Sequence, residues 1–265
     1  MTKNKKAHQK EDGFWKNSIA KFKSVDLEYE FYNPSKALTY CAISDLIREF
    51  LGRKASIIEF GCGSGLLLCY LYKNGLSVIG YDNSSYAIKY AKLLQKSKNI
   101  KYRLRKTNVF YMKIMKKYDA VISSGVIEHF NKNLQIRFIE KMKKCSKKYL
   151  FIMYPNINSQ IYKRFIKKQK KIYPLEKEKF NVNIPFMFKK LNIRLVEKRS
   201  FGLFDKESIK NNKLLNNKDK KIIINVLDKK STKTEFKRAH YLELKLSNKV
   251  KSGFLNLYIG EVLAN

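Results

Sequence analysis

The chain of 265 residues carries 57 Lys and Arg against 22 Asp and Glu, which gives a formal net charge of +35. Hydrophobic residues make up 44% of the chain and aromatic residues 13%, so a packed core is expected and a wholly disordered basic chain is excluded. No run approaches the ~18 uninterrupted apolar residues of a membrane span, and no apolar signal segment follows the basic N-terminus. The four cysteines form no C-x-x-C pair, which argues against a zinc site or a disulfide framework. These features predict a cytoplasmic protein without a transmembrane segment.

The positive charge has two interpretations. Of the basic residues, 48 are Lys and 9 are Arg, whereas nucleic-acid surfaces usually recruit Arg for bidentate contacts. A Lys-rich surface that faces solvent accounts for this bias. The alternative is an anionic partner, such as nucleic acid, a membrane surface or an acidic glycan.

Strands and helices are predicted to alternate through the first part of the chain. Helical spacing of apolar residues after Asn33-Pro34 predicts a helix to residue 50. Short apolar runs predict strands at 55–60, 77–81, 100–105, 119–123 and 149–153, with helices at 66–72, 86–95 and 132–145. This alternation predicts the α/β class, a Rossmann-like, doubly wound and mostly parallel sheet with helices on both faces. Such sheets bind ligands at the carboxyl ends of their strands.

The pattern is weaker after residue 156. Residues 160–173 form a basic helix candidate, and 205–221 is Lys- and Asn-rich, which suggests a loop or a loose helix. Further strands are predicted at 193–201, 241–246 and 254–263.

A glycine-rich segment follows the strand at 55–60. Gly61, Gly63 and Gly65 alternate with other residues, and Glu59 precedes the first of them by two positions. A dinucleotide site requires its third glycine one residue later, where Leu66 stands. A carboxylate at Glu59 would also repel a pyrophosphate, but it suits a ligand that carries an ammonium group and a sulfonium. S-adenosylmethionine is such a ligand.

The segment resembles the first motif of the class I S-adenosylmethionine-dependent methyltransferases. Residues 78–82 (VIGYD) look like the second motif, and Thr107-Asn108-Val109 lies where the family often has Gly-Asp-x. Residues 118–130, with Glu128-His129 near their end, are similar to the branch that includes ubiquinone-biosynthesis O-methyltransferases, which also has a Pro-Asn after strand five, here Pro155-Asn156. The resemblance covers about residues 40–156. It implies a seven-stranded sheet with an antiparallel last strand, and S-adenosyl-L-methionine as cofactor.

The resemblance also implies which residues bind the cofactor. Asp82 holds the position that takes both ribose hydroxyls, and Asn108 replaces the usual Asp near the adenine amino group, which leaves a carbonyl acceptor there. Ser123 ends the fourth strand, where it can contact the methionine moiety. The full predicted set is Glu59, Gly61, Cys62, Gly63, Gly65, Asp82, Asn83, Asn108, Val109 and Ser123.

His129 is the candidate general base, since an imidazole can take a proton from a hydroxyl at neutral pH. The alternative is that His129 and Glu128 only orient the loop. Relatives that bind a divalent cation have a Glu where Gly125 stands, so no metal is predicted. The resemblance implies methyl transfer to a small-molecule acceptor, with oxygen as the expected atom and an anionic acceptor as one option. The alternative is an RNA methyltransferase that uses the basic surface.

A division of the chain follows from these assignments. Residues 1–34 are expected to form a basic N-terminal tail and lid. Tyr29, Tyr32 and Tyr40 are candidates for a lid over the cofactor, with core or surface packing as the alternative. Residues 35–156 would form the cofactor-binding core. Residues 157–265 would supply a substrate-recognition insertion and the terminal strands of the same domain.

Overall fold

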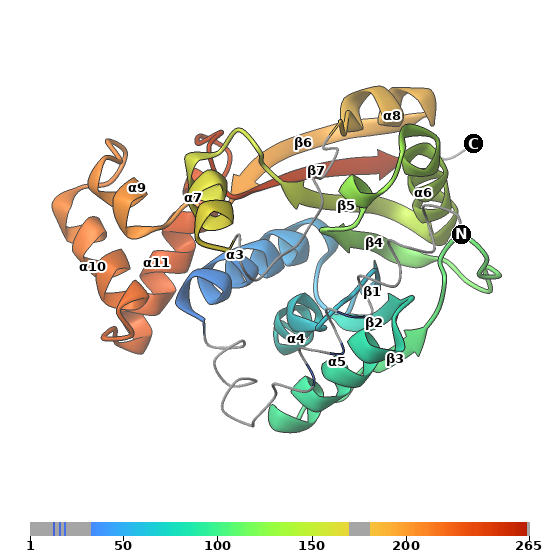
Figure 1. Cartoon of the computed structure of the whole chain (residues 1–265), viewed down its shortest axis with the longest axis horizontal. Helices are drawn as coiled ribbons and strands as arrows, with labels where there is room; N and C mark the ends of the chain where they lie inside the picture. The colour runs from blue at the N-terminus through green and yellow to red at the C-terminus, as the bar shows by residue number, and fades with distance from the viewer. Residues whose placement is uncertain (1–12, 14–15, 17–18, 20–32, 170–180, 264–265) are drawn as a thin grey trace.

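The fold is built on one sheet of seven strands in the order β3-β2-β1-β4-β5-β7-β6 (Figure 1). The computed structural model describes residues 33–169 and 181–263, together with residues 13, 16 and 19. The strands are β1 (Ser56–Phe60), β2 (Ser77–Asp82), β3 (Arg103–Lys106), β4 (Tyr118–Ser124), β5 (Ser146–Pro155), β6 (Ile193–Phe201) and β7 (Leu255–Val262). The predicted mostly parallel, doubly wound sheet is therefore confirmed.

One strand runs against the others. β7 pairs antiparallel with β5 on one side and with β6 on the other. The remaining pairs, from β3 through β5, are parallel. The central strands are apolar on both faces, as in β1, where Ile57, Ile58 and Phe60 are fully buried. That pattern is expected where helices cover both sides of a parallel sheet.

Helices cover the two faces of the sheet in separate groups. α3 (Pro34–Leu51), α4 (Leu66–Lys73) and α5 (Ser85–Ser97) lie on one face, where their apolar residues pack against side chains of β1, β2, β4 and β5. α6 (Lys132–Cys145) and α8 (Ile184–Lys190) lie on the other face. Because the connections are short, every one of these helices returns the chain to the start of a strand.

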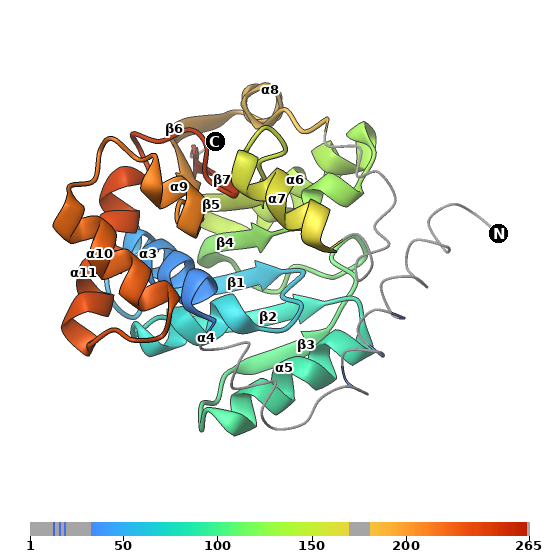
Figure 2. The same cartoon turned by 60° about the vertical axis from the view of Figure 1, so that its left-hand side comes forward.

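Three helices lie between β6 and β7 in sequence and extend beyond α3 (Figure 2). They are α9 (Lys206–Lys210), α10 (Asn217–Leu227) and α11 (Lys233–Leu246). Leu242 and Leu246 of α11 join Leu38 of α3 in one buried cluster. The prediction of a strand at 241–246 is wrong, because these residues form the end of α11. The segment 205–221 contains α9 and the start of α10.

The basic segment after β5 forms α7 (Gln160–Gln169), as predicted, and residues 170–173 lie outside the described residues. The N-terminal lid with Tyr29 and Tyr32 also lies outside them. None of the helices in the described ranges is long and apolar enough to cross a bilayer.

Candidate cofactor site

The carboxyl ends of β1, β2 and β4 meet at one edge of the sheet. Glu59 of β1 pairs with Gly80 of β2 on one side and with Ile122 of β4 on the other. The residues at these three strand ends therefore gather at this edge, and they include every predicted cofactor residue except Asn108 and Val109. Those two follow β3, the next strand along the sheet.

The glycine loop turns sharply between β1 and α4. Gly61, Gly63 and Gly65 have φ angles of 72°, 49° and 70°, in the left-handed region that glycine adopts without steric cost. The backbone N–H groups of Gly61 and Cys62 both donate to the carbonyl of Tyr81, at 2.7 and 3.0 Å. These bonds fix the loop to the end of β2, whose last residue is Asp82.

Two of these glycines are also required because side chains from other segments approach them closely. A β-carbon on Gly61 would lie 2.4 Å from Cγ2 of Val126, which follows β4. A β-carbon on Gly65 would lie 2.8 Å from Oη of Tyr102, and that hydroxyl donates to the Gly65 carbonyl at 2.9 Å. Val126 lies in the segment 118–130 that resembles the family, and Tyr102 lies in the predicted strand at 100–105. Their contacts with the glycine loop could not be predicted, since only the folded chain brings them to it.

Asp82 holds the loop from the end of β2. Its side chain is 4% exposed. Oδ2 accepts the backbone N–H of Gly63 at 2.8 Å, and Oδ1 accepts that of Ser84 at 2.8 Å. The carboxylate is therefore oriented by two fixed donors before any ligand contributes. Asn83, beside it, is half-buried.

Two predicted cofactor residues at this edge each have a buried oxygen that makes no hydrogen bond within the described residues. The two atoms are Oε2 of Glu59 and Oγ of Ser123, on side chains that are 2% and 1% exposed. Burial, together with the negative charge of Asp82, raises the pKa of Glu59 well above its usual value. A buried polar atom without a partner costs about 1–3 kcal/mol, so both atoms fit a site completed by a ligand with hydrogen-bond donors and positive charge.

S-adenosylmethionine has the groups that these residues can satisfy. Its ammonium group and sulfonium match buried carboxylates, and its ribose hydroxyls are donors for a carboxylate at the end of β2. The residues present therefore fit this cofactor.

Cys62 is a packing residue of the loop. Its thiol is 6% exposed, and a β-carbon on Gly80 would lie 2.8 Å from Sγ. Burial and the nearby Asp82 and Glu59 carboxyls raise the pKa of the Cys62 thiol well above its usual value. A thiol held in the protonated form is a poor nucleophile, so no covalent role follows for it.

Asn108 and Val109 follow β3. Oδ1 of Asn108 accepts the backbone N–H of Phe110 at 3.0 Å, which fixes the direction of the side-chain amide. Its second lone pair stays available, because a carbonyl oxygen can accept two hydrogen bonds. Val109 is buried against the sheet.

His129 and Glu128 differ in their surroundings. Both belong to a short 3-10 helix, η1 (Ile127–His129). Glu128 is buried, with 3% of its side chain exposed, whereas His129 is exposed. The imidazole of His129 therefore faces solvent, whereas the carboxyl of Glu128 is enclosed by the protein.

Arg164 of the basic helix α7 is paired with carboxylates of the protein itself. Arg164 donates to both carboxylate oxygens of Asp205, at 2.8 Å each, and pairs with Glu207 at 3.3 Å. These contacts attach α7 to the start of α9. Lys163 and Lys167 remain exposed, so this helix offers less positive charge to a ligand than its sequence indicates.

Comparison with known proteins identifies the family to which this chain is similar. A family model described as "Methyltransferase domain" matches residues 35–239. A ubiquinone biosynthesis O-methyltransferase of Pelagibacter ubique is 29% identical over 112 residues, covering 37% of this chain and 47% of that protein. The corresponding protein of Nitrobacter winogradskyi is 33% identical over 73 residues, 28% of each chain. The chain thus spans about half of the first relative and a smaller part of the second.

Two solved structures illustrate the shared fold. A SAM dependent methyltransferase from Archaeoglobus fulgidus has a TM-score of 0.50 and 18% identity, over 83% of this chain and 92% of that one. A protein from Pyrococcus horikoshii has a TM-score of 0.50 and 13% identity, over 83% and 87%. At these identities the likeness concerns the fold alone.

Proposed function

The chain belongs to the S-adenosylmethionine-dependent methyltransferases, whose domain model spans residues 35–239, and we propose that it methylates an oxygen atom of a small molecule. The observation that carries the proposal is the pair of buried oxygens without hydrogen-bond partners, on Glu59 and Ser123, beside the exposed His129. The similarity to two ubiquinone biosynthesis O-methyltransferases supports oxygen as the accepting atom.

When bound, S-adenosylmethionine supplies a methyl group activated by a sulfonium. Asp82 would hold the ribose hydroxyls through its carboxylate, whose position the N–H groups of Gly63 and Ser84 fix. Glu59 would hold the ammonium group at the methionine end, and Ser123 would offer a hydroxyl there. Val109 and Asn108 would border the adenine. The turn itself would be lined by Gly61, Cys62, Gly63, Gly65 and Asn83.

His129 serves as the general base. A ring nitrogen of His129 would take the hydroxyl proton of the acceptor, which would leave an oxygen nucleophile for the methyl group that the cofactor supplies. A base at this position is needed because hydroxyl groups are weak nucleophiles while they keep their proton.

Cofactor binding and acceptor binding are assigned to two different parts of the chain. Residues 35–156 hold the cofactor, and residues 157–265 shape the acceptor site and complete the sheet. The order of the elements supports this division, since α8 and the helices after β6 follow the last of the cofactor residues.

Calorimetry tests the cofactor site. Wild-type protein should bind S-adenosylmethionine and S-adenosylhomocysteine, and Asp82→Ala should weaken both at least 10-fold, since a charged hydrogen-bond partner is lost. Asp119→Ala is the matched control. Asp119 is a strand carboxylate that bonds to Ser56 at the opposite edge of the sheet, so its removal should leave both affinities unchanged. Absence of binding by wild type would overturn the proposed function.

A further inference from the structure

The two most exposed large hydrophobic side chains of the described residues lie on one loop. Tyr111 is 83% exposed and Met115 is 88% exposed, and both belong to the loop that joins β3 to β4. Figure 1 shows this loop, in green, at the outer margin of the molecule beside the end of β3. Apolar side chains scattered singly over a surface carry no meaning, but apolar side chains that gather in one place mark a surface for association.

The loop holds these two side chains outward. Three of its other residues pack against a core cluster, namely Phe110, Met112 and Ile114. Nζ of Lys141, in α6, donates to the carbonyl of Met112 at 2.8 Å, which attaches the loop to the body of the protein. Because Tyr111 and Met115 alternate with the packed residues, they face solvent from a segment of defined conformation.

Positive charge surrounds the two side chains. Lys113, Lys116 and Lys117 lie on the same loop and are exposed. Residues 83–118, which run from the end of β2 to the start of β4, contain no Asp or Glu. Neither Lys113 nor Lys117 pairs with a carboxylate of the described residues. The loop therefore presents ammonium groups and apolar side chains next to one another.

A basic groove continues from this loop. It has a volume of about 830 Å³ and lies at the edge of the sheet where β4 and β5 begin. Glu140 is the one carboxylate among the described residues that line it. The lysines that line it come from the loop, α6, β5 and α8, and they are Lys117, Lys143, Lys144, Lys147 and Lys190. Lys117 stands two residues after Met115, so the loop and the groove form one surface, here called the basic face.

Interactions within the protein use only part of this charge. The ends of α6 and α8 carry partial negative charge, which the lysines of their last turns offset. Lys144 also pairs with Glu140 at 2.7 Å. Lys147 and Lys117 belong to no helix. The first lies 3.7 Å from Asp119, and the second has no carboxylate partner in the described part of the chain. Positive charge therefore remains for a partner outside the protein.

The composition of the basic face distinguishes among anionic partners. The cations of the loop and the groove are all Lys, whereas nucleic-acid sites rely on Arg for bidentate contacts. An anionic membrane surface attracts Lys as a point charge, without a fixed geometry. Tyr111 suits the boundary between headgroups and acyl chains, since its ring is apolar and its hydroxyl is polar. Met115 adds apolar surface beside it.

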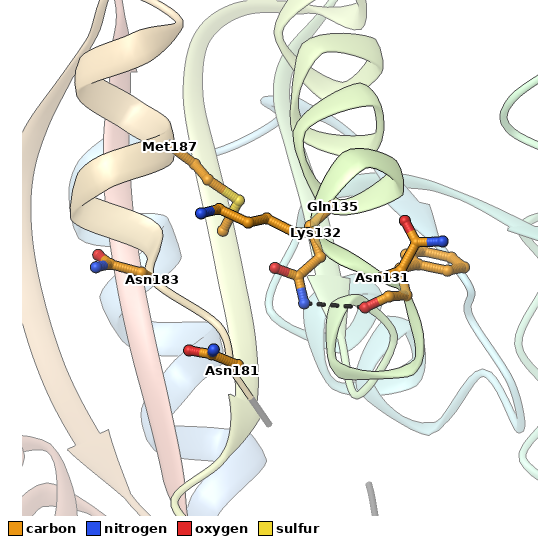
Figure 3. A pocket seen from close by; sticks show the side chains of 7 residues that line it. Asn131, Lys132, Gln135, Asn181, Asn183 and Met187 are labelled. Atoms are coloured by element: carbon orange, nitrogen blue, oxygen red, sulfur yellow. Dashed lines mark hydrogen bonds between the residues drawn. The ribbon is translucent and has the colours of Figure 1, made fainter. Parts of the chain in front are cut away.

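We propose that the basic face docks on an anionic lipid membrane. Tyr111 and Met115 enter the headgroup layer, and the lysines of the loop and the groove lie against lipid phosphates. A second pocket, of about 320 Å³, lies between the first residues of α6 and α8 (Figure 3), at the other end of α6 from the groove. Docking on the basic face would therefore leave this pocket and the cofactor edge of the sheet open to water.

Sedimentation with lipid vesicles tests the apolar part of the basic face. Wild type should bind vesicles of an equimolar mixture of phosphatidylcholine and phosphatidylglycerol about 10-fold more tightly than vesicles of phosphatidylcholine alone. The double variant Tyr111→Ser/Met115→Ser should bind the mixed vesicles about 10-fold more weakly, because it loses the apolar anchor. Leu214→Ser/Tyr241→Ser is the matched control and should keep the wild-type affinity. These two side chains are 57% and 49% exposed, and they belong to the region of α9 to α11, at the opposite side of Figure 1.

The same assay tests the charge of the basic face. Lys113→Gln/Lys117→Gln should weaken binding to the mixed vesicles about 10-fold, since each lysine near an anionic surface contributes to binding. The control is Lys218→Gln/Lys221→Gln, which removes the same charge from two exposed positions of α10. Because α10 lies away from the basic face, this control should stay close to the wild-type affinity.

Three outcomes would overturn the proposal. The first is that wild type does not bind the mixed vesicles, or binds both kinds of vesicle equally. The second is that each double variant behaves like its control, since the overall charge and not the basic face would then drive the attraction. The third is that the lysine variant loses binding to poly(U) RNA while wild type ignores vesicles, which would assign the face to nucleic acid.

The assay is independent of the proposed function. All the substituted side chains are exposed, and chemical denaturation of each variant reports whether it folds. No step uses S-adenosylmethionine or a methyl acceptor. A failure of membrane binding would therefore leave the proposed methyl transfer untouched, and a failure of cofactor binding would leave the proposed docking untouched.

Discussion

Gly61 and Val126 bring the loops after β1 and β4 into contact, because a β-carbon on Gly61 would lie 2.4 Å from Cγ2 of Val126. The φ angle of 72° at Gly61 adds a second reason for glycine. The two loops carry the cofactor turn and the proposed base, so this contact sets the distance between them.

Gly61→Ala should lower the free energy of unfolding by about 2–4 kcal/mol, from the clash and from the left-handed backbone. Adding Val126→Ala removes the clash but not the backbone strain. Chemical denaturation of the single and double variants should therefore give a favourable coupling of about 1 kcal/mol or more. Strict additivity of the two changes would show that the loops do not touch.

His129→Ala should lower turnover by about 100-fold or more, because general-base catalysis typically contributes that much. The affinity for S-adenosylhomocysteine should stay the same, since the imidazole is exposed and lies outside the glycine loop. Transfer of a labelled methyl group to a hydroxylated acceptor measures the first quantity, and calorimetry the second. Unchanged turnover would leave His129 and Glu128 with an orienting role only.

Glu243 makes stability depend on pH. Its buried side chain accepts the N–H groups of Gly202 and Leu203, at 2.6 and 3.1 Å, and burial raises its pKa to about 7. The folded protein therefore holds a proton that the unfolded chain, with an ordinary Glu pKa of about 4.3, has already released. Stability from this group is fully present below about pH 4 and is lost as the pH rises to about 7.

Glu243→Gln tests this dependence. The amide keeps an oxygen for the two N–H groups and has no proton to lose, so the difference in unfolding free energy between variant and wild type should shift by up to about 3 kcal/mol in favour of the variant between pH 5 and pH 8. Urea titrations at the two pH values measure it. A constant difference would mean that Glu243 does not titrate in this range.

Tyr102→Phe should cost about 1 kcal/mol of stability, because the hydroxyl donates to the Gly65 carbonyl at 2.9 Å and contacts Sγ of Cys69 at 3.3 Å. Tyr72→Phe is the control. Its ring lies 6.0 Å from that of Tyr102, but its hydroxyl makes no hydrogen bond with a described residue. Equal losses of stability in the two variants would show that the hydrogen bond from Tyr102 to Gly65 does not stabilise the protein.

The sequence predicted the first five strands and their helices because apolar runs and glycine turns mark them. It also predicted the strand at 193–201, which is β6. The error at 241–246 has a physical cause. Leu242, Leu244 and Leu246 alternate as in a strand, but Ala239, Leu242 and Leu246 are buried on one face of a helix.

A local signal could have corrected that error. Thr232 and Glu235 form a capping box at the start of α11, and a Thr followed three residues later by Glu is a recognised start of a helix. The cofactor residues follow a motif, so they could be predicted. The contacts of Val126 and Tyr102 with the glycine loop join segments far apart in sequence, and no motif predicts them.

The position of β7 has a consequence for synthesis. β6 reaches the sheet only through β7, which separates it from β5. While the chain is being made, the ribosome releases β6 before its only neighbour exists. The strands up to β5 can assemble as they emerge, but β6 must wait until α9, α10, α11 and β7 have followed. The far edge of the sheet is therefore the last part of the described fold to form.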